Sequence, residues 1–451
     1  MEIQEFKDRV FAAGQAAGLE DMEIYVSKSK TFSTCVFHKE VDDYTVSVEQ
    51  GVGFRARFSG KVGYAYVEIL DQDSVDLLIS GAKANAQIIE SDDEIEFFEG
   101  SPRYPEVIAY NRSLEAISAE EKIEFAKALE SEAFATDERV SMVNYAVTGY
   151  SETEVYMANT KGLEQSFERN GAVSFVSAVV REGEQIKTGM RMMFGNNWGE
   201  FDAERLAQDA VREATSLLGA KSVPSGNYPV LLRHDVARDL LSTFASVFSA
   251  EAVQKGLSLL EGRLGQQIAS PRLTLVDDPL LKNGGASASF DGEGVATRTK
   301  KVIEAGQLTT FLHNLKTAKK DGMESTGNAS RPSFKSPVGI SPTNFFIEPG
   351  TLTYDELVTK MGDGIIIIDV QGLHSGANPV SGDFSLGAYG YLVENGQIVG
   401  PVEQITVAGN FFEVLETVEE IGSDLEFGSP GSRGHVGSPT LLIRHLSIAG
   451  M

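Results

Sequence analysis

The stretch Ser222-Val-Pro-Ser-Gly-Asn-Tyr-Pro229 divides this chain of 451 residues into two parts of different character. Two prolines and a glycine within eight residues favour an irregular connection between domains. A chain of this length also exceeds the size at which a single hydrophobic core keeps growing. We therefore predict an N-terminal domain over residues 1–222 and a C-terminal domain over residues 223–451.

On the N-terminal side of this stretch, helical and strand-like patterns alternate in blocks. Apolar residues recur at helical spacing near both ends of each block, and short alternating runs rich in Val, Tyr, Phe and Thr lie between them. Ser118 and Glu121 form a capping-box pattern at the start of one helix. The acidic, proline-containing segment 91–105 is typical of a connection. The prediction is an α/β half made of two helix-strands-helix units, at about 1–90 and 106–221.

On the C-terminal side, the pattern is mostly β. An apolar strand at Val230–Leu232 is followed by one long helical region from His234 to about Leu260, and then by short strands with glycine-rich turns. Asn395-Gly396 predicts a type I′ hairpin turn. The all-apolar run Ile365–Ile368 predicts a strand buried on both faces. The fold class is therefore α+β, with a β-rich C-terminal domain that contains one long helix.

Composition excludes several classes of protein. Lys and Arg number 39 and Asp and Glu 65, so the formal charge is -26, which disfavours direct nucleic-acid binding. Cys35 is the single cysteine, which rules out an intramolecular disulfide and fits a reducing compartment. The sequence has no apolar run of about 18 residues and no signal-peptide pattern at its start. We expect a cytoplasmic protein without contact to membranes.

Common hydrolase motifs are missing from the sequence. It contains no Gly-x-Ser-x-Gly elbow and no Walker loop, and none of its six histidines begins a His-Glu-x-x-His pair. With six histidines and one cysteine, a conventional zinc site has few possible ligands.

A series of spaced motifs nevertheless resembles the TldD/PmbA (TldE) family of metallopeptidase-related proteins, also named modulators of DNA gyrase. The motifs follow one another from about residue 285 to 450, and the resemblance is closest to the metal-lacking TldE/PmbA branch. They are Asp291-Gly-Glu-Gly-Val-Ala-Thr-Arg298, Ile303-Glu-Ala-Gly-Gln-Leu308, Ser325-Thr-Gly-Asn-Ala329, Gly372-Leu-His374, Ser381-Gly-Asp-Phe-Ser385, Ala408-Gly-Asn410 and Gly437-Ser-Pro439.

In catalytic members the resemblance implies a His-Glu-x-x-x-His motif after a Val-Leu-Leu-like strand, with a cysteine near the C-terminus as a further zinc ligand. Here Arg233 and Arg238 stand at the two histidine positions and His234 at the glutamate position. Two guanidiniums would repel a dication. A register shifted by one residue places His234, Asp235 and Asp239 there instead, and residues 428–437 contain no cysteine. We expect no metal in this chain, with the zinc in a TldD-like partner.

The alternative is that these residues have a structural role only and form the solvated start of a helix. In that case Asp235 lies near the positive end of the helix and pairs with Arg238 three residues on.

Two other groups of residues are candidates for contact with a substrate or a partner. His374, Ser381, Asp383 and Ser385 lie in a Gly- and Ser-rich loop after the apolar strand, where irregular segments often carry function. The alternative for these residues is turn chemistry, with the side chains bonded to nearby backbone. His435 is expected in a Gly/Ser-rich tail loop that contacts a partner.

The resemblance implies a non-catalytic subunit of a TldD/TldE-type zinc metallopeptidase complex that processes unstructured peptides. A peptide would bind such a strand-rich domain as an added strand. The expected partners are a TldD-like catalytic subunit and the peptide, with a possible homodimer in isolation. Two alternatives stay open: a stand-alone atypical hydrolase using His234, Asp235 and Asp239 or His374 and Asp383, and a regulatory protein-binding factor that acts on DNA gyrase.

Overall fold

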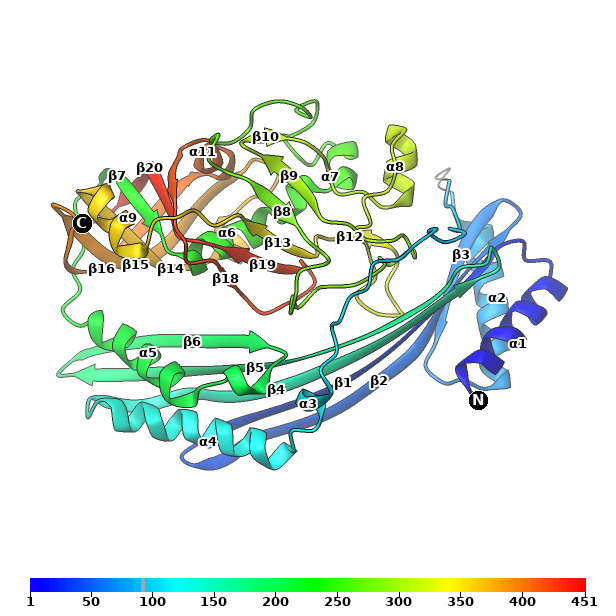
Figure 1. The fold of residues 1–451 in the computed structure, drawn as a ribbon, viewed down its shortest axis with the longest axis horizontal. Helices are drawn as coiled ribbons and strands as arrows, with labels where there is room; N and C mark the ends of the chain where they lie inside the picture. The colour runs from blue at the N-terminus through cyan, green and yellow to red at the C-terminus, as the bar shows by residue number, and fades with distance from the viewer. Residues whose placement is uncertain (91–93) are drawn as a thin grey trace.

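The fold is a mixed α and β structure, taken here from a computed structural model that describes residues 1–90 and 94–451. Residues 91–93 of the predicted connection lie outside the described residues. A long antiparallel sheet forms one layer of the molecule, and the C-terminal half lies along one face of this sheet (Figure 1).

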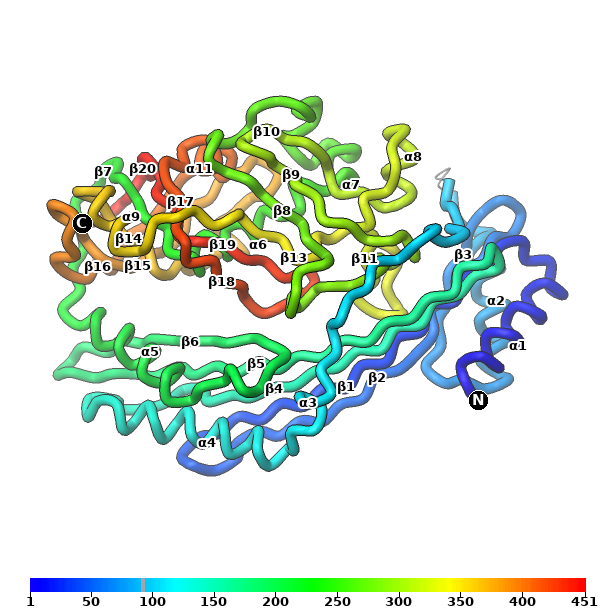
Figure 2. Tube along the Cα trace, viewed as in Figure 1, coloured from blue at the N-terminus to red at the C-terminus, as the bar shows by residue number. Residues whose placement is uncertain are grey.

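The N-terminal sheet has six strands in the order β3-β2-β1-β4-β5-β6, and every neighbouring pair is antiparallel. With 20 residues, β4 spans about 65 Å at about 3.3 Å per residue, and the sheet as a whole extends along most of the molecule (Figure 2). The sequence predicts shorter runs here, but neighbouring strands pair across the polar segments between those runs. The strands are β1 Met22–Phe37, β2 Glu40–Phe58, β3 Lys61–Val67, β4 Val140–Asn159, β5 Glu164–Glu182 and β6 Gln185–Gly195.

Helices cover the two ends of this sheet (Figure 1). At one end α1 and α2 pack together and α2 lies on β3, while at the other end α4 and α5 pack together and α5 lies on β6. Each contact needs a glycine, because a Cβ at Gly63 would lie 1.9 Å from the Ala82 carbonyl oxygen and one at Gly189 would lie 2.1 Å from that of Ala210. The helices are α1 Ile3–Ala16, α2 Gln72–Ile88, α3 Arg112–Glu115, α4 Ala119–Thr136 and α5 Ala203–Ser216, with a 3-10 turn η1 at Trp198–Glu200.

Helix, three strands and helix thus occur twice along one sheet, with β1 and β4 at its centre. The predicted capping box of α4 is confirmed, because Ser118 Oγ accepts from Glu121 N and the Glu121 carboxylate accepts from Ser118 N. Residues 94–111 connect the two units and touch both halves of the protein. Asn159 Nδ2 donates to the Phe98 carbonyl, and the Tyr104 hydroxyl donates to the Gly294 carbonyl.

The C-terminal half contains two further six-stranded sheets and a two-stranded one. The first has the order β16-β15-β14-β7-β20-β17, and an additional β16–β20 pairing closes it into a barrel. The second has the order β10-β9-β8-β13-β19-β18. Their strands are β7 Gly226–Leu232, β8 Leu275–Asp277, β9 Lys300–Glu304, β10 Gln307–Leu308, β11 Ala329–Ser330, β12 Gly339–Ile340, β13 Asn344–Ile347, β14 Gly364–Gln371, β15 Asp383–Glu394, β16 Gln397–Asn410, β17 Val418–Ile421, β18 Glu426–Phe427, β19 His435–Ser438 and β20 Leu441–Ala449.

The helices of this half are short, and the prediction of one long helix from His234 to about Leu260 is wrong. The region is α6 His234–Phe244, a 3-10 turn η2 at Ala245–Phe248 and α7 Ala250–Gln254. At the break, Leu312 N donates to the Phe248 carbonyl and Ala250 N donates to the Leu312 carbonyl, so tertiary bonds replace bonds within a helix. The remaining helices are α8 Leu315–Asp321, α9 Tyr354–Met361, α10 Leu373–Gly376 and α11 Phe411–Glu416.

Two local predictions in this half are confirmed. Ile365–Ile368 in β14 is at most 1 % exposed, and Asn395 and Gly396 have φ of 51° and 73° in the β15–β16 turn. The end of the predicted interdomain stretch belongs to β7, which pairs with β20. Pro229 cannot donate to that ladder, and the register of the pair shifts beside it.

Candidate functional site

A cavity of about 370 Å³ lies between the N-terminal sheet and the loops of the C-terminal half. Strands β1, β4, β5 and β6 form one wall, and loops from residues 285–297, 327–343 and 430–434 form the other. The second wall contains parts of two sequence motifs singled out above, Asp291–Arg298 and Ser325–Ala329. Side chains that line it include Tyr25, Thr153, Phe167, Arg169, Phe194, Phe290, Asp291, Thr297, Arg331, Ser341 and Thr343.

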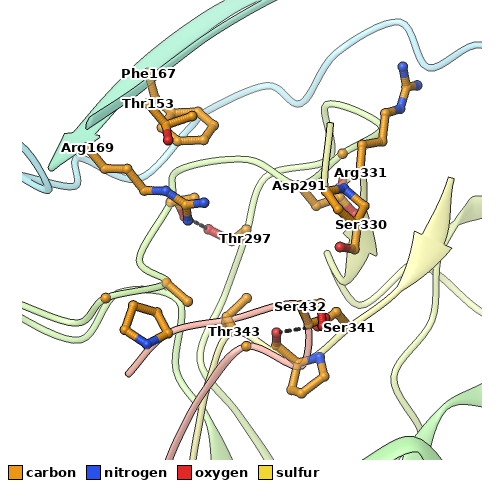
Figure 3. Close-up of a pocket in the computed structure, with 18 of the residues that line it drawn as sticks. Thr153, Phe167, Arg169, Asp291, Thr297, Ser330, Arg331, Ser341, Thr343 and Ser432 are labelled. Carbon is orange, nitrogen blue, oxygen red and sulfur yellow. Dashed lines mark hydrogen bonds between the residues drawn. The ribbon is translucent and has the colours of Figure 1, made fainter. Parts of the chain in front are cut away.

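Arg169 on β5 points into this cavity, toward Thr297 (Figure 3). Its guanidinium has no hydrogen bond or ion pair with any residue in 1–90 or 94–451. Burial lowers the pKa of Arg169, and the nearby Tyr25 opposes that shift. The dashed line that ends on Thr297 in Figure 3 is the bond from its hydroxyl to the Ala288 carbonyl, 2.5 Å.

Asp291 holds two loops of the opposite wall together. Its Oδ1 accepts from the backbone N–H groups of Glu293 (2.9 Å) and Val295 (3.0 Å), and its Oδ2 accepts from that of Ala329 (2.9 Å). Burial, together with the neighbouring Glu293 charge, raises the pKa of Asp291 to about 7. Because all three donors are backbone groups, the Asp291 carboxylate fixes the backbone of the two loops that form this wall.

A buried ion network joins the sheet to the same wall. Glu23 on β1 is 0 % exposed and accepts from Arg55 Nε at 2.7 Å and from Arg331 Nη2 at 2.5 Å. Arg55 also reaches Glu293 at 3.4 Å. Arg331 stacks over the Tyr25 ring at 4.9 Å from its centroid. These charges therefore connect β1 and β2 to the loops that carry the Asp291 and Ala329 motifs.

The residues at the zinc-motif positions lie at the start of α6, where β7 ends. Arg233 contacts Asp235 through Nε (2.8 Å) and Nη2 (2.5 Å), Glu213 of α5 through Nη1 (2.5 Å) and the Ile368 carbonyl through Nη2 (2.9 Å). Burial would raise the pKa of Asp235, but Arg233 outweighs burial and lowers it. The predicted Asp235–Arg238 pair is therefore wrong, because Arg238 pairs with Asp239. This helix start is half-buried instead of solvated, because α6 packs against β19 and β14 and Arg233 is bound to Glu213 of α5.

Arg238, the second arginine of the motif, pairs with Asp239 at 2.9 Å. Both residues line a second cavity of about 280 Å³, together with Met192 and the loop 428–434. This cavity shares Gly431, Ser432 and Gly434 with the first one. Burial raises the pKa of Asp239 against the effect of Arg238.

The donor set at these positions does not fit a zinc ion. Two arginines occupy the histidine positions, and His234 lies 3.6 Å from Glu426. In the part of the chain that the structure describes, no three His, Cys, Asp or Glu side chains are grouped so that they could hold a metal. Besides Asp239, Asp369 on β14 is a second carboxylate with a raised pKa next to this motif. Its burial and the neighbouring Asp235, Glu213 and Asp239 charges raise the pKa to about 6.

The loop candidates lie elsewhere. His374 is exposed in the short helix α10, and Ser385 is exposed on β15. Asp383 N donates to Ser381 Oγ at 3.3 Å, and Asp383 Oδ1 accepts from Asn410 Nδ2 at 2.9 Å. The bond from Asn410 lowers the pKa of Asp383. None of these residues lines the two cavities described above.

The prediction that His435 lies in a tail loop is wrong, and its contact with a partner stays a prediction. His435 begins β19 and is 4 % exposed, because that strand pairs with β13 inside the second sheet. The Gly285 N–H donates to its Nδ1 at 2.9 Å, so the proton lies on Nε2 and is donated to the Gly428 carbonyl at 3.0 Å. Burial lowers the pKa of His435 to about 4. This neutral imidazole therefore links the loop at Gly285 to the loop at Gly428, next to the cavities.

Sequence reasoning missed Arg169, Glu23 and Arg331. Arg169 lies between two predicted strand runs, and a charged residue there is typical of a solvated strand face. Glu23 and Arg331 are 308 residues apart and meet through tertiary packing alone. The one available signal was that Arg331 follows the Ser325–Ala329 motif closely.

Comparison with known proteins agrees with this architecture. Family models match the PmbA/TldA metallopeptidase C-terminal domain at residues 225–450, the central domain at 112–218 and domain 1 at 22–86. An uncharacterized protein of Methanocaldococcus jannaschii is 29 % identical over 97 % of this chain and 98 % of its own length. The metalloprotease PmbA of Escherichia coli O157:H7 is 25 % identical over 97 % and 94 %.

Solved structures show the same fold. The crystal structure of a candidate modulator of a DNA gyrase from Thermotoga maritima has a TM-score of 0.91 and 36 % identity, and covers 99 % of this chain and 100 % of that one. TldE from Thermococcus kodakarensis has a TM-score of 0.90 with the same coverage, and at 23 % identity it shows the fold alone. The chain is therefore a metallopeptidase-like protein. It belongs to the PmbA/TldD family. In the part of the chain that the structure covers, no helix is long and apolar enough to cross a membrane.

Proposed function

We propose that this chain is a non-catalytic subunit of a TldD/TldE-type peptidase complex, in which it holds an unstructured peptide while a TldD-like partner supplies the zinc. The observation that carries the proposal is that Arg233 and Arg238, each tied to carboxylates, take the metal-ligand positions, while two adjoining cavities are kept between the sheet and the C-terminal half.

The surfaces around these cavities suit a peptide of varied sequence. Met190 and Met192 on β6 are 56 % and 38 % exposed, and Met192 lines the second cavity. Methionine side chains adapt to different partners. The aromatic rings of Phe167, Phe194 and Phe290 line the first cavity. Hydrolysis needs an activated water, which in this family's catalytic chains the zinc would provide by lowering the pKa of its bound water to about 7.

The test is a peptide-cleavage assay with this chain alone, a TldD-like partner alone, and the mixture, each with and without a chelator. We expect robust cleavage in the mixture only, and its loss when the chelator is added. Chelator-insensitive cleavage by this chain alone would reject the proposal in favour of a stand-alone hydrolase. Equal cleavage by the partner with and without this chain would remove the role assigned here.

A further inference from the structure

Arg169 is the feature of the larger cavity that the proposed function does not yet use. A guanidinium carries five N–H donors and keeps its charge at any physiological pH. The other charged groups at the cavity have partners inside the protein. Arg331 is paired with Glu23, and only its buried Nε lacks a hydrogen bond among the described residues. Asp291 accepts three backbone N–H groups. Arg169 has no such partner within the described ranges, 1–90 and 94–451.

Three hydroxyl groups of the cavity wall are also engaged inside the protein. Thr297 donates to the Ala288 carbonyl, Ser341 to the Ser432 carbonyl at 3.1 Å and Thr343 to Asp277 at 2.8 Å. Arg169 therefore gives the cavity a planar cation beside the aromatic rings of Phe167 and Phe290. A partly buried charge is costly when it stays unpaired, so such a group is suited to a ligand that brings the opposite charge.

The size and walls of the cavity narrow the class of ligand. Its volume of about 370 Å³ lies within the range of about 300–1,000 Å³ that small-molecule sites occupy. Phe167 and Phe290 form part of the lining, with their ring centroids 5.3 Å apart. An anionic group next to an apolar side chain matches this arrangement, and guanidinium binds a carboxylate through two parallel hydrogen bonds.

We propose that Arg169 binds a carboxylate of the peptide held in this cleft, with the neighbouring apolar side chain of the peptide resting on the aromatic wall. The inference rests on the proposed function and deepens it, because it gives the non-catalytic subunit a means of selecting the end or the acidic residue of its peptide. Two sources can bring this chemistry, the C-terminal carboxylate and the side chain of an acidic residue.

The experiment measures binding by fluorescence anisotropy with three ten-residue peptides of Ala, Ser and Gly that end in Leu. All carry fluorescein at the N-terminus. The first has a free C-terminal carboxylate, the second is its C-terminal amide, and the third is the amide with Glu next to the terminal Leu. The proteins are the full chain, Arg169→Gln, Arg169→Lys and, as a matched control, Arg181→Gln, which changes an exposed arginine on the same strand.

We expect the full chain to bind a carboxylate-bearing peptide about ten- to a hundred-fold more tightly than the plain amide, the range of a charge-assisted hydrogen bond. Arg169→Gln should abolish this preference, Arg169→Lys should keep part of it and Arg181→Gln all of it. A preference for the free acid alone assigns the C-terminus, and equal gains for the free acid and the Glu peptide assign any carboxylate. Thermal unfolding of each variant checks that it is folded.

Three results would overturn the inference: equal affinity for all peptides, a carboxylate preference that survives Arg169→Gln, or no binding of any peptide by the full chain. The first two leave the proposed function intact, because a peptide is still held. The third result overturns the role of Arg169. If the mixture with the partner still cleaves peptides in the cleavage assay, the proposed function stands, so the two proposals fail separately.

Discussion

The buried carboxylate of Glu23 gives the most demanding test of how the two halves are joined. In Glu23→Gln the side chain keeps its shape but loses its charge. Arg55 retains Glu293 at 3.4 Å, whereas Arg331, which is 8 % exposed, loses its anion. Removing one partner of a buried ion pair costs about 3–5 kcal/mol, and with one of the two arginines still paired we expect about 3 kcal/mol. That is a large share of a typical folding free energy of about 5–15 kcal/mol.

The assay is urea unfolding followed by tryptophan fluorescence and circular dichroism, with the free energy of unfolding compared between variants. Glu23→Gln combined with Arg331→Met should recover most of the loss, because the unpaired charge is gone. The matched control is Glu154→Gln on the same sheet. The Glu154 carboxylate is solvent-exposed and lies 3.1 Å from Lys28, so losing this pair should cost at most about 1 kcal/mol. A Glu23→Gln protein as stable as this control would refute the reasoning, and so would a double variant no more stable than the single one.

The same network predicts a dependence on pH. Burial would raise the pKa of Glu23, but the charges of Arg55 and Arg331 outweigh burial and hold it below its ordinary value of 4.5. The pair therefore contributes its full stability above pH 4.5 and loses it as the pH falls through the lowered pKa. In urea unfolding below pH 4.5, the free energy of unfolding of Glu23→Gln should fall less steeply with decreasing pH than that of the natural chain.

Three further outcomes are expected. As the pH falls from 6.5 to 4, the natural chain should lose up to about 3 kcal/mol relative to His435→Gln, because the pKa of about 4 makes the unfolded chain take up that proton first; parallel pH profiles of urea unfolding would contradict this. Gly189→Ala should cost about 1–3 kcal/mol, since its Cβ would lie 2.1 Å from the Ala210 carbonyl oxygen, whereas Gly400→Ala, with nothing within 4 Å, should be nearly neutral in thermal unfolding. Elemental analysis after dialysis should find far less than one zinc per chain; about one zinc, lost in His234→Ala, would show that the motif reasoning is wrong.

Local features of the fold were predictable where the signal was local. The capping box at Ser118 and the hairpin turn at Asn395-Gly396 depend on residues within three positions of each other, and both are confirmed. The break after Phe248 was not predictable, because it depends on backbone bonds to Leu312, more than 60 residues away. The length of the N-terminal strands was missed for the same reason, since pairing partners sustain them through polar stretches.

The candidate site shows the same division. Arg233 and Arg238 could be placed at the motif positions by resemblance, but their partners Glu213 and Asp239 could be identified only from the folded chain. His435 misled the prediction, because a Gly- and Ser-rich neighbourhood is typical of a loop and here encloses a buried strand. Arg169 lies outside every motif that the sequence offered. It became a candidate only because its guanidinium lacks a partner within the described residues.

The closure of the barrel by β20 determines when the protein can finish folding. β20 pairs with β7, where Leu441 lies opposite Leu232, and with β16, where Ile448 lies opposite Val407. These pairings cannot form before residue 449 has left the ribosome, whereas all strands of the N-terminal sheet are complete by residue 195. During synthesis, the first sheet therefore folds while β7 and β16, strands with buried apolar residues, still lack their last neighbour. The growing chain has to keep these strand edges from pairing with other chains until β20 arrives.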